Sequence, residues 1–190
     1  MPRSKGPTLT SVRNAVKKAG HIWHVEPFEF NLVGIRTPDE TPWAFNDWIT
    51  LSWGDDLGMI FFRRWRASTQ AGVFWRGHPA NSGAGEAHLQ CGRYPDLWRL
   101  GRHRGRDFAL MQRRKVKLWA TRKQRKTLSF DPAGRFGANL HHHESELYRW
   151  APGAQVMKNK HELSELISIV QHCQTVKAQG CGYTLVEALK

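Results

Sequence analysis

The fold of this chain is restricted most by a series of short segments in which apolar and polar residues alternate, separated by turn residues. In the first segment, residues 25–37, Phe28, Phe30 and Leu32 alternate with polar neighbours. Such alternation places apolar side chains on one face of an extended strand. Similar segments predict further strands at residues 46–53, 59–67, 108–112, 116–120 and 137–143. We therefore expect a mostly β fold with minor α content.

Helical spacing occurs in two places. Thr8 or Thr10 is suited to cap a short helix over residues 11–18, which ends at Gly20. Towards the C-terminus, apolar residues recur every three to four positions and form one stripe: Leu163, Leu166, Ile167, Val170 and Cys173. The stripe predicts a helix that packs on the strands. Residues 183–189 are expected to add a last strand or to pack as a tail.

A long loop is predicted at residues 76–97, where Gly, Pro, Asn and Ser are frequent and periodicity is weak. Loops of this length often carry function. The candidate functional side chains of this region are Trp75, His78, Asn81 and Tyr94. The basic run at residues 122–126 is interpreted as an exposed hairpin tip.

Composition limits the class of protein. The chain has 190 residues, of which 40% are hydrophobic and nine are Trp, so it can bury a core and is not a disordered segment. The chain has no run of about 18 uncharged apolar residues, so we predict no transmembrane helix. The basic start lacks the apolar segment of an ordinary secretory signal. We expect a basic N-terminal segment with a short helix at residues 1–24 and one domain at residues 25–190.

The cysteines predict neither a disulfide framework nor a zinc knuckle. The chain has three, Cys91, Cys173 and Cys181, and no two of them have C-x-x-C spacing. None has a base beside it in the sequence. We interpret all three as small packing residues, and we expect no cofactor.

A net charge of +13 predicts an anionic partner. Basic residues cluster at 63–66, 102–106, 113–115 and 122–126. Peptidoglycan or another anionic cell-wall polymer fits such clusters, nucleic acid is a second candidate, and a solvated face without a partner is a third. Nucleic acid is less favoured than the wall, because only Arg64-Trp65-Arg66 interleaves an aromatic ring with basic residues and no known nucleic-acid motif accompanies it.

Three successive histidines, His141, His142 and His143, are followed by Glu144 and Glu146. On a strand only His141 and His143 share a face. Two such histidines with a carboxylate and a water are able to bind zinc, although the segment lacks the helical spacing of a zinc-protease motif. Two other interpretations remain open: histidines at the surface or core edge, and one histidine that acts as a catalytic acid or base.

The segment from Tyr148 to Val156, YRWAPGAQV, is similar to the W-S-x-G-C-Q-V motif of the phage- and bacteria-encoded branch of the L,D-transpeptidase-like proteins. In that branch an Asn-apolar-His strand precedes the motif, as Asn139-Leu140-His141 does here. Further segments that resemble the branch are residues 31–36, 45–49, 100–105 and 183–185. The resemblance extends from about residue 30 to the C-terminus, and it rests mainly on the order and spacing of short motifs.

The resemblance implies a catalytic role for three positions. His141 matches the histidine that takes the proton from a cysteine thiol, and Gly153 matches the glycine whose tight backbone directs an N–H towards the oxyanion. Ala154 occupies the position of the nucleophilic cysteine, without which the acyl-enzyme cannot form. Ala151 replaces the Ser or Thr of the motif, and Pro152 differs from the His of the wider family. Two explanations of Ala154 stay open: the cysteine was removed before study, or the chain is a natural pseudoenzyme.

The candidates for substrate binding are His103, Arg104, Asn139 and Trp150. The resemblance places His103 and Arg104 near the active centre, where Arg104 is suited to bind a carboxylate bidentately. A basic turn without such a role is the alternative. Trp150 flanks loop sequence and is a candidate for contact with sugar or peptide.

The resemblance implies an L,D-transpeptidase-like curved mixed sheet or β-sandwich with one packed helix, which binds and processes peptidoglycan stem peptides. We expect the protein to be made in the cytoplasm and to act at the cell wall, in the periplasm or within a phage-like particle, as a lysin or delivered effector inactivated by Ala154. A non-catalytic binding or structural component of a phage or phage-tail-like particle is the alternative. A zinc hydrolase built on His141 and His143 is a third hypothesis.

Overall fold

A computed structural model describes residues 6–39, 41, 44–70, 88–114, 116–119, 127–130, 138–143 and 153–188 of the chain. Over these residues the fold is mostly β with two helices, which confirms the predicted fold class. The helices are α1 (Leu9–Lys18) and α2 (Lys160–Val176). The strands are β1 (Phe30–Arg36), β2 (Asp47–Gly54), β3 (Ile60–Ser68), β4 (His88–Leu89), β5 (Gly92–His103), β6 (Asp107–Gln112), β7 (Val116–Trp119), β8 (Thr127–Phe130), β9 (Leu140–His142), β10 (Gln155–Met157) and β11 (Cys181–Glu187).

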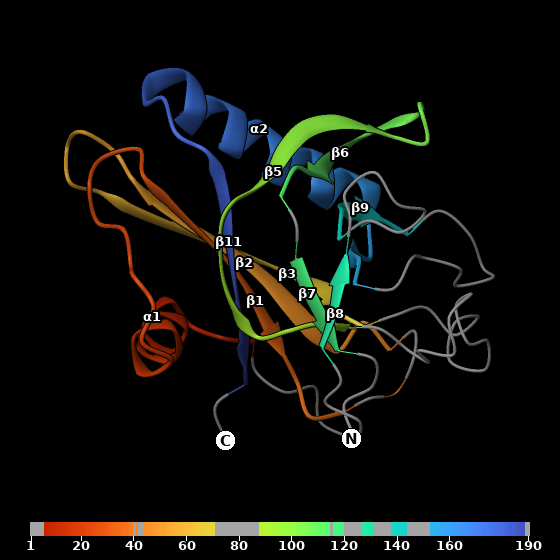
Figure 1. Ribbon diagram of the computed structural model, residues 1–190. Coiled ribbons are helices and arrows are strands. Elements are labelled where there is room, and N and C mark those ends of the chain that lie inside the picture. Colours follow the sequence, from red (N-terminus) through yellow and green to blue (C-terminus); the bar gives the residue numbers. More distant parts are fainter. Residues whose placement is uncertain are drawn as a thin grey trace.

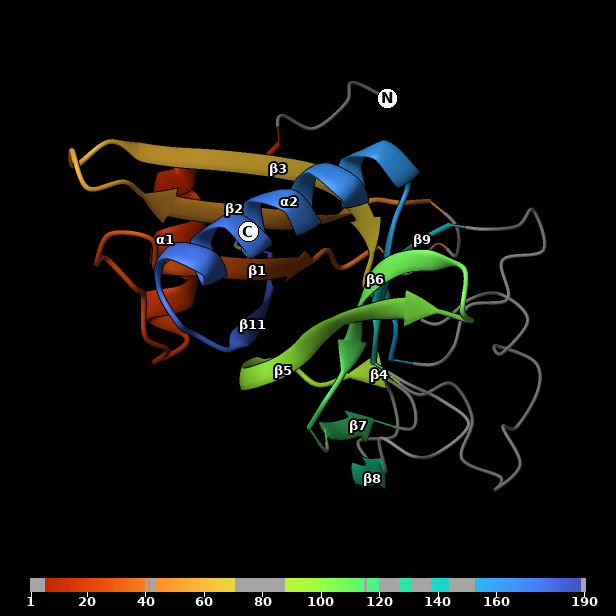
Figure 2. The same ribbon diagram turned by 90° about the horizontal axis from the view of Figure 1, so that it is seen from above.

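Eight of the strands close into a barrel in the order β1-β11-β5-β6-β9-β10-β3-β2 (Figures 1 and 2). β1 pairs with β11, and β9 with β10, in parallel, and the other neighbours are antiparallel. β4, β7 and β8 form a separate antiparallel sheet. The expected mixed sheet is therefore present. It closes on itself because β1 forms hydrogen bonds to both β2 and β11, which leaves no free edge in the barrel.

β2 and β3 form a long hairpin and confirm two of the predicted strands. They pair in continuous register over all eight residues of β2. At the turn, the Asp55 carboxylate accepts hydrogen bonds from the backbone N–H groups of Leu57 and Met59. This local pattern is typical of Asp in turns. Figure 2 shows the hairpin extending beyond the other strands of the barrel.

The prediction of a loop over residues 76–97 is wrong at its C-terminal end. β4 and β5 begin within it, and Tyr94 is a half-buried side chain of β5 whose hydroxyl donates to the Gln90 carbonyl. The other candidates from that region, Trp75, His78 and Asn81, and the basic run at 122–126 lie outside the described residues.

An irregularity explains why β5 was not predicted. Tyr94 pairs with Tyr183 and Trp98 pairs with Cys181, so the three β5 residues centred on Asp96 lie opposite a single residue of β11. Asp96 itself has a positive φ of 50°. A bulge of this kind interrupts the alternation of side chains, which is the signal that predicts a strand.

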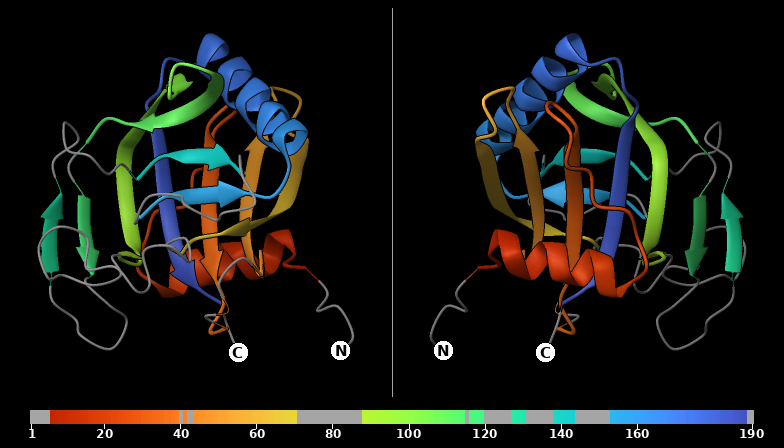
Figure 3. Two further views of the ribbon diagram at one scale, coloured as in Figure 1. Left: turned by 90° about the vertical axis from the view of Figure 1, so that its right-hand side faces the viewer. Right: turned by 90° about the vertical axis from the view of Figure 1, so that its left-hand side faces the viewer.

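The core of the barrel combines inward-facing strand residues with one face of α2. The apolar stripe predicted from the sequence is buried in this core: Leu163, Leu166, Ile167, Val170 and Cys173. Figure 3 shows α2 lying across one end of the barrel. The helix therefore removes that end of the core from water.

α1 packs on the outside of the barrel against β1 and β11. Thr8 begins the helix with a reciprocal cap, in which each of Thr8 and Ser11 donates its backbone N–H to the other's hydroxyl oxygen, at 2.9 and 3.2 Å. The side chains that make the contact are Val12, Ala15 and Val16 of α1 and Val33, Ile35 and Val186 of the strands. The predicted short helix is thus present and packs on the same barrel.

The cysteines have different environments. Cys173 and Cys181 are buried, as expected of packing residues, whereas Cys91 is exposed next to β5, so the packing interpretation is wrong for Cys91. Burial, with a smaller effect of the Asp96 carboxylate, raises the pKa of the Cys181 thiol to about 12.

No helix in the described part of the chain is long and apolar enough to cross a membrane.

Candidate functional site

The candidate catalytic residues lie at two short parallel strands: His141 is in β9, and Gly153 and Ala154 directly precede β10. Val156 pairs with His141 in this register, and the Gln155 N–H donates to the Asn139 carbonyl at 2.8 Å. Registered residues of a parallel pair point to the same face, and so do alternate residues of one strand. His141 and Ala154 therefore lie on one face of the pair, whereas Leu140 and Met157 point into the barrel core.

His141 is a buried, neutral base. Its side chain is 4% exposed, and its Nδ1 lies 2.7 Å from the His142 carbonyl oxygen. A carbonyl only accepts, so Nδ1 carries the hydrogen and Nε2 carries the lone pair. Nε2 is buried without a hydrogen-bond partner among the described residues. Burial, followed by the nearby His103, lowers the pKa of His141 to about 3.

His103 completes a pair of stacked imidazole rings. Its ring is nearly parallel to that of His141, with an interplanar angle of 4° and 4.3 Å between ring centroids. His103 ends β5, and the next three residues, 104–106, form the turn to β6. Arg104, in that turn, is exposed, has a φ of 50° and contributes to the lowered pKa of His141. The structure thus brings His103 and Arg104 to the same place as His141.

Gly153 and Ala154 provide the backbone of the expected nucleophile position and no nucleophile. Gly153 has a φ of 79°, in the left-handed region that favours glycine, and its carbonyl accepts a hydrogen bond from Gln155 Nε2 at 3.0 Å. Ala154 is fully buried and packs with Phe45 and Val156. A methyl group neither ionises nor attacks a carbonyl carbon, so position 154 contributes no covalent chemistry.

Asn139 has a structural role in the described geometry, and Trp150 lies outside the described residues. The Asn139 side-chain oxygen accepts a hydrogen bond from the Gln112 N–H at 2.7 Å, and its carbonyl binds the first residue of β10. Asn139 therefore joins β9 to β6 and β10 and positions His141, two residues later.

Asp107 and Lys160 lie beside the histidines and were not predicted. Lys160, at the start of α2, forms an ion pair with Asp107, and His142 Nε2 lies 3.9 Å from the same carboxylate. The hydrogen bond from Lys160 is the main cause that lowers the pKa of Asp107. The sequence has no signal for this contact, because the two residues are far apart in the chain and meet only when α2 packs on the barrel.

Inside the barrel, a hydrogen bond connects β11 to β10, the strand that directly follows Ala154. Tyr183 is fully buried and donates its hydroxyl hydrogen to Gln155 Oε1 at 2.7 Å. Gly34 of β1 makes this contact possible, because a Cβ there would overlap Tyr183 Oη. Gly34, Gln155 and Tyr183 come from three of the segments on which the resemblance was based, and these segments meet in the barrel core.

A second buried polar group connects the ends of several strands. The Arg36 guanidinium, 3% exposed, donates to the Leu89 carbonyl at 2.9 Å and to both oxygens of Thr69 at 2.7 and 2.9 Å. Asp47 accepts hydrogen bonds from the N–H and hydroxyl of Thr69 and of Thr37. These hydrogen bonds hold Thr69, which follows β3, and Thr37, which follows β1, to Asp47 at the start of β2.

The histidines do not form a metal centre with other described side chains. Within the described ranges, no three His, Cys, Asp or Glu residues lie close enough together to hold a metal ion. His143, on the same face as His141, packs against the Phe45 ring at 5.7 Å between centroids. Glu144 and Glu146, the candidates for the carboxylate of the zinc hypothesis, lie outside the described residues, so that hypothesis stays a prediction.

Comparison with models of known protein families, with curated proteins and with solved structures found no match to this chain. The resemblance to L,D-transpeptidase-like proteins is therefore still a prediction from its motifs.

Proposed function

We propose that this chain carries an L,D-transpeptidase-like site for peptidoglycan stem peptides in which Ala154 prevents acyl transfer. The observation that supports the proposal is the position of His141, whose basic nitrogen is buried without a described partner on the same face as Ala154. A cysteine at that position would bring a thiol to the face that carries this nitrogen. The histidine half of a nucleophile–base pair is present and the nucleophile is not.

The proposed chemistry of a cysteine form is acyl transfer. His141 Nε2 would take the thiol proton, the thiolate would attack a peptide carbonyl carbon, and the imidazolium would return the proton to the leaving amine. The N–H groups at Gly153 and residue 154 are the proposed donors to the oxyanion. The low pKa of His141 makes an isolated imidazolium unfavourable, but an adjacent thiolate would offset part of that cost.

The proposed partner is anionic peptidoglycan. The net charge of +13 favours association with a polymer that carries carboxylates, and Arg104 lies in the turn directly after the His103 that stacks on His141. We propose Arg104 as the group that binds a stem-peptide carboxylate. The proposed place of action is the cell wall, or a phage-like particle that reaches it.

The proposed function is tested with purified peptidoglycan and three proteins: the chain as it stands, its Ala154→Cys variant, and Ala154→Cys combined with His141→Phe. Mass spectrometry of soluble and residual muropeptides reads the result. We expect stem peptides to be released or exchanged by Ala154→Cys alone, because the double variant keeps an aromatic ring against His103 but has no base. An unchanged wall with the folded Ala154→Cys variant would contradict the catalytic part.

The second candidate function, a non-catalytic binding or structural component, is favoured by the packing of Ala154. Its methyl group is fully buried against Phe45 and Val156, as expected of a residue that belongs to the native core. Cosedimentation with insoluble peptidoglycan measures binding of the chain to the wall. A comparison of two variants that each lose one positive charge distinguishes specific binding from charge attraction. We expect Arg104→Gln to weaken cosedimentation more than Arg99→Gln, which removes an equal charge from an exposed position of β5.

A further inference from the structure

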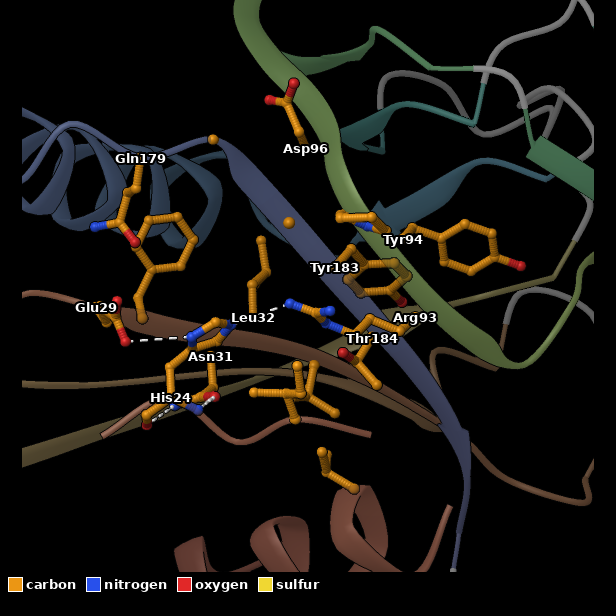
Figure 4. Close-up of a pocket in the computed structure, with 17 residues that line it drawn as sticks. His24, Glu29, Asn31, Leu32, Arg93, Tyr94, Asp96, Gln179, Tyr183 and Thr184 are labelled. Carbon is orange, nitrogen blue, oxygen red and sulfur yellow. Dashed lines mark hydrogen bonds and ion pairs between the residues drawn. The ribbon is translucent and has the colours of Figure 1, made fainter. Parts of the chain in front are cut away.

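A pocket of about 270 Å³ lies on the outer side of the barrel, far from His141 in the strand order. Its floor is the outward face of β1, β11 and β5, and its walls are α1 and the connector at residues 21–29 (Figure 4). β11 is four strands from β10 in either direction around the barrel. The pocket is therefore separate from the candidate site at β9 and β10.

The pocket exists because of the bulge in β5 and of two glycines, Gly180 directly before β11 and Gly182 within it. At Gly180, a Cβ would lie 2.5 Å from Asp96 Oδ1, so only glycine fits beside the bulge. At Gly182, a Cβ would meet its nearest atom, the Tyr94 carbonyl oxygen, at 3.6 Å. The absence of side chains here exposes backbone and leaves space that a larger residue would fill.

A chain of polar contacts forms one wall. His24 Nδ1 lies 3.2 Å from Glu29 Oε2, and His24 Nε2 lies 3.4 Å from an Nη of Arg93 (Figure 4). The backbone of His24 exchanges two hydrogen bonds with the Asn31 side chain, at 2.8 and 2.9 Å. The imidazole is therefore held in place, with Nδ1–H directed to the carboxylate and Nε2 accepting from the guanidinium.

Both acids of the pocket have cationic partners of their own. Glu29 lies 3.0 Å from Lys177 Nζ, and Asp96 lies 3.2 and 3.0 Å from the Arg113 and Arg114 guanidinium groups. Burial alone would raise the pKa of Glu29, but Lys177 and His24 outweigh it and hold that pKa below its usual value. The negative charges of the pocket are thus neutralised within the described structure.

Arg93 remains as the cation without a carboxylate partner among the described residues. Its side chain makes one hydrogen bond there, to His24 Nε2 at 3.4 Å, and this bond occupies a single N–H donor. A guanidinium has five N–H donors in a planar arrangement that fits a carboxylate. It is half-buried, so water screens its charge less than it would on an open surface.

We propose that this pocket binds a small carboxylate, with the acid group on Arg93 and the uncharged end over Gly180 and Gly182. The volume is slightly below the range of pockets for drug-sized ligands, which is about 300–1,000 Å³, and it suits an acid of a few carbon atoms. The Thr184 hydroxyl, beside Arg93 in the strand register, is a further polar group at the acid end.

The pocket is tested by NMR titration of the full ¹⁵N-labelled chain with sodium propionate and sodium butyrate at constant ionic strength. Propylammonium chloride and sodium chloride serve as control ligands. We expect saturable shifts of the Arg93 Nε–H and of the Gly182 and Thr184 amides with the carboxylates only. Shifts that stay linear, or that are equal for chloride and carboxylate, would overturn the proposal.

Two variants locate the binding. We expect Arg93→Gln to weaken carboxylate binding by about tenfold or more, because a charge-assisted pair is lost. Arg99→Gln, exposed on the same strand and outside the pocket, is the control and should bind as the unaltered chain does. Gly182→Ala adds a methyl group without a close contact and should weaken binding several-fold. Unchanged affinity in folded Arg93→Gln, or in Gly182→Ala if Arg93→Gln does not fold, would refute the assignment.

Discussion

The two polar regions on opposite sides of the barrel differ in how they hold their ionisable groups. On β9 and β10, His141 is neutral because burial removes water and no carboxylate contacts it among the described residues. In the pocket on β1, β11 and β5, the carboxylates Glu29 and Asp96 are paired with Lys and Arg side chains at 3.0–3.2 Å. The first region is suited to move a proton and the second to hold a charged ligand.

Tyr183 connects the two regions through the barrel. It belongs to β11, which forms the pocket floor, and its hydroxyl reaches Gln155 of β10, next to Ala154. The two regions therefore share a core even though their surfaces are separate. Changes in that core should affect both regions, whereas changes at either surface should affect one.

The largest effect is expected for Gly34→Ala. A Cβ at position 34 would overlap Tyr183 Oη and lie 2.9 Å from Leu185 Cδ1, so β1 or Tyr183 must move. We expect the free energy of unfolding to fall by about 3 kcal/mol in urea titrations, as for other overpacked cores. Gly54→Ala is the control, because its Cβ would meet only the Met59 carbonyl at 3.6 Å. Equal effects of the two substitutions would show that Gly34 is not the point where the regions share their core.

The second prediction concerns the pH dependence of stability. The His141 pKa is about 3 when folded and 6.5 ordinarily, so below pH 6.5 the unfolded chain binds a proton that the folded chain does not. The contribution of neutral His141 is fully present above pH 6.5 and is lost as the pH falls towards 3. Relative to His141→Phe, we expect a loss of about 2–3 kcal/mol between pH 7 and pH 4.5.

Urea titrations of the unaltered chain and of His141→Phe at both pH values measure that difference. The comparison with His141→Phe cancels the titration of the carboxylates, which both proteins share. Parallel pH profiles for the two proteins would contradict the buried, neutral state of His141, and would remove the contrast with the charged pocket.

Removal of the hydrogen bond that crosses the core should have an intermediate effect. Tyr183→Phe leaves Gln155 Oε1 without its donor in a fully buried place, which we expect to cost about 1–2 kcal/mol. Tyr94→Phe removes a hydroxyl that is half-buried, and we expect a smaller loss. Thermal unfolding followed by tryptophan fluorescence measures both variants. A larger loss for Tyr94→Phe would refute the assigned link between the regions.

The smallest effect is expected at the pocket surface. Glu29→Gln removes the ion pair with Lys177 and weakens the hydrogen bond with His24, and both contacts are partly exposed, so we expect a loss of less than about 1 kcal/mol. Glu26→Gln, at an exposed position of the same connector, should have no measurable effect. Chemical denaturation at low and high salt measures both, and any loss for Glu29→Gln should shrink at high salt. A loss as large as that of Tyr183→Phe would mean that the pocket charges belong to the core.

Much of the secondary structure was predictable because it depends on neighbours in the chain. The hairpin of β2 and β3, the cap at Thr8 and the apolar stripe of α2 all follow from local spacing. β5 was missed where the bulge around Asp96 interrupts that spacing, since the bulge is defined by its partner strand β11. The alternation also predicted that His141 and His143 share a face.

The composition of each site was less predictable than the strands that carry it. The resemblance suggested His141, Gly153 and Ala154 and placed His103 near them, but it did not indicate that the His103 ring stacks on His141 or that Asp107 pairs with Lys160. The pocket combines residues 24–31, 93–96 and 179–184, which have no common motif. Their meeting depends on which strands pair and in which register.

The sequence by itself determined the mostly β character, the two helices, the basic charge and the alanine at the position where the resembling proteins have a nucleophile. Those properties follow from residue types and from periodicity within one segment. Only the tertiary structure decided that the sheet closes into a barrel, that His141 is buried and neutral, and that Arg93 faces a pocket. The reason is physical: burial and pKa depend on which distant residues exclude water from a group, and that exclusion arises only when the whole barrel packs.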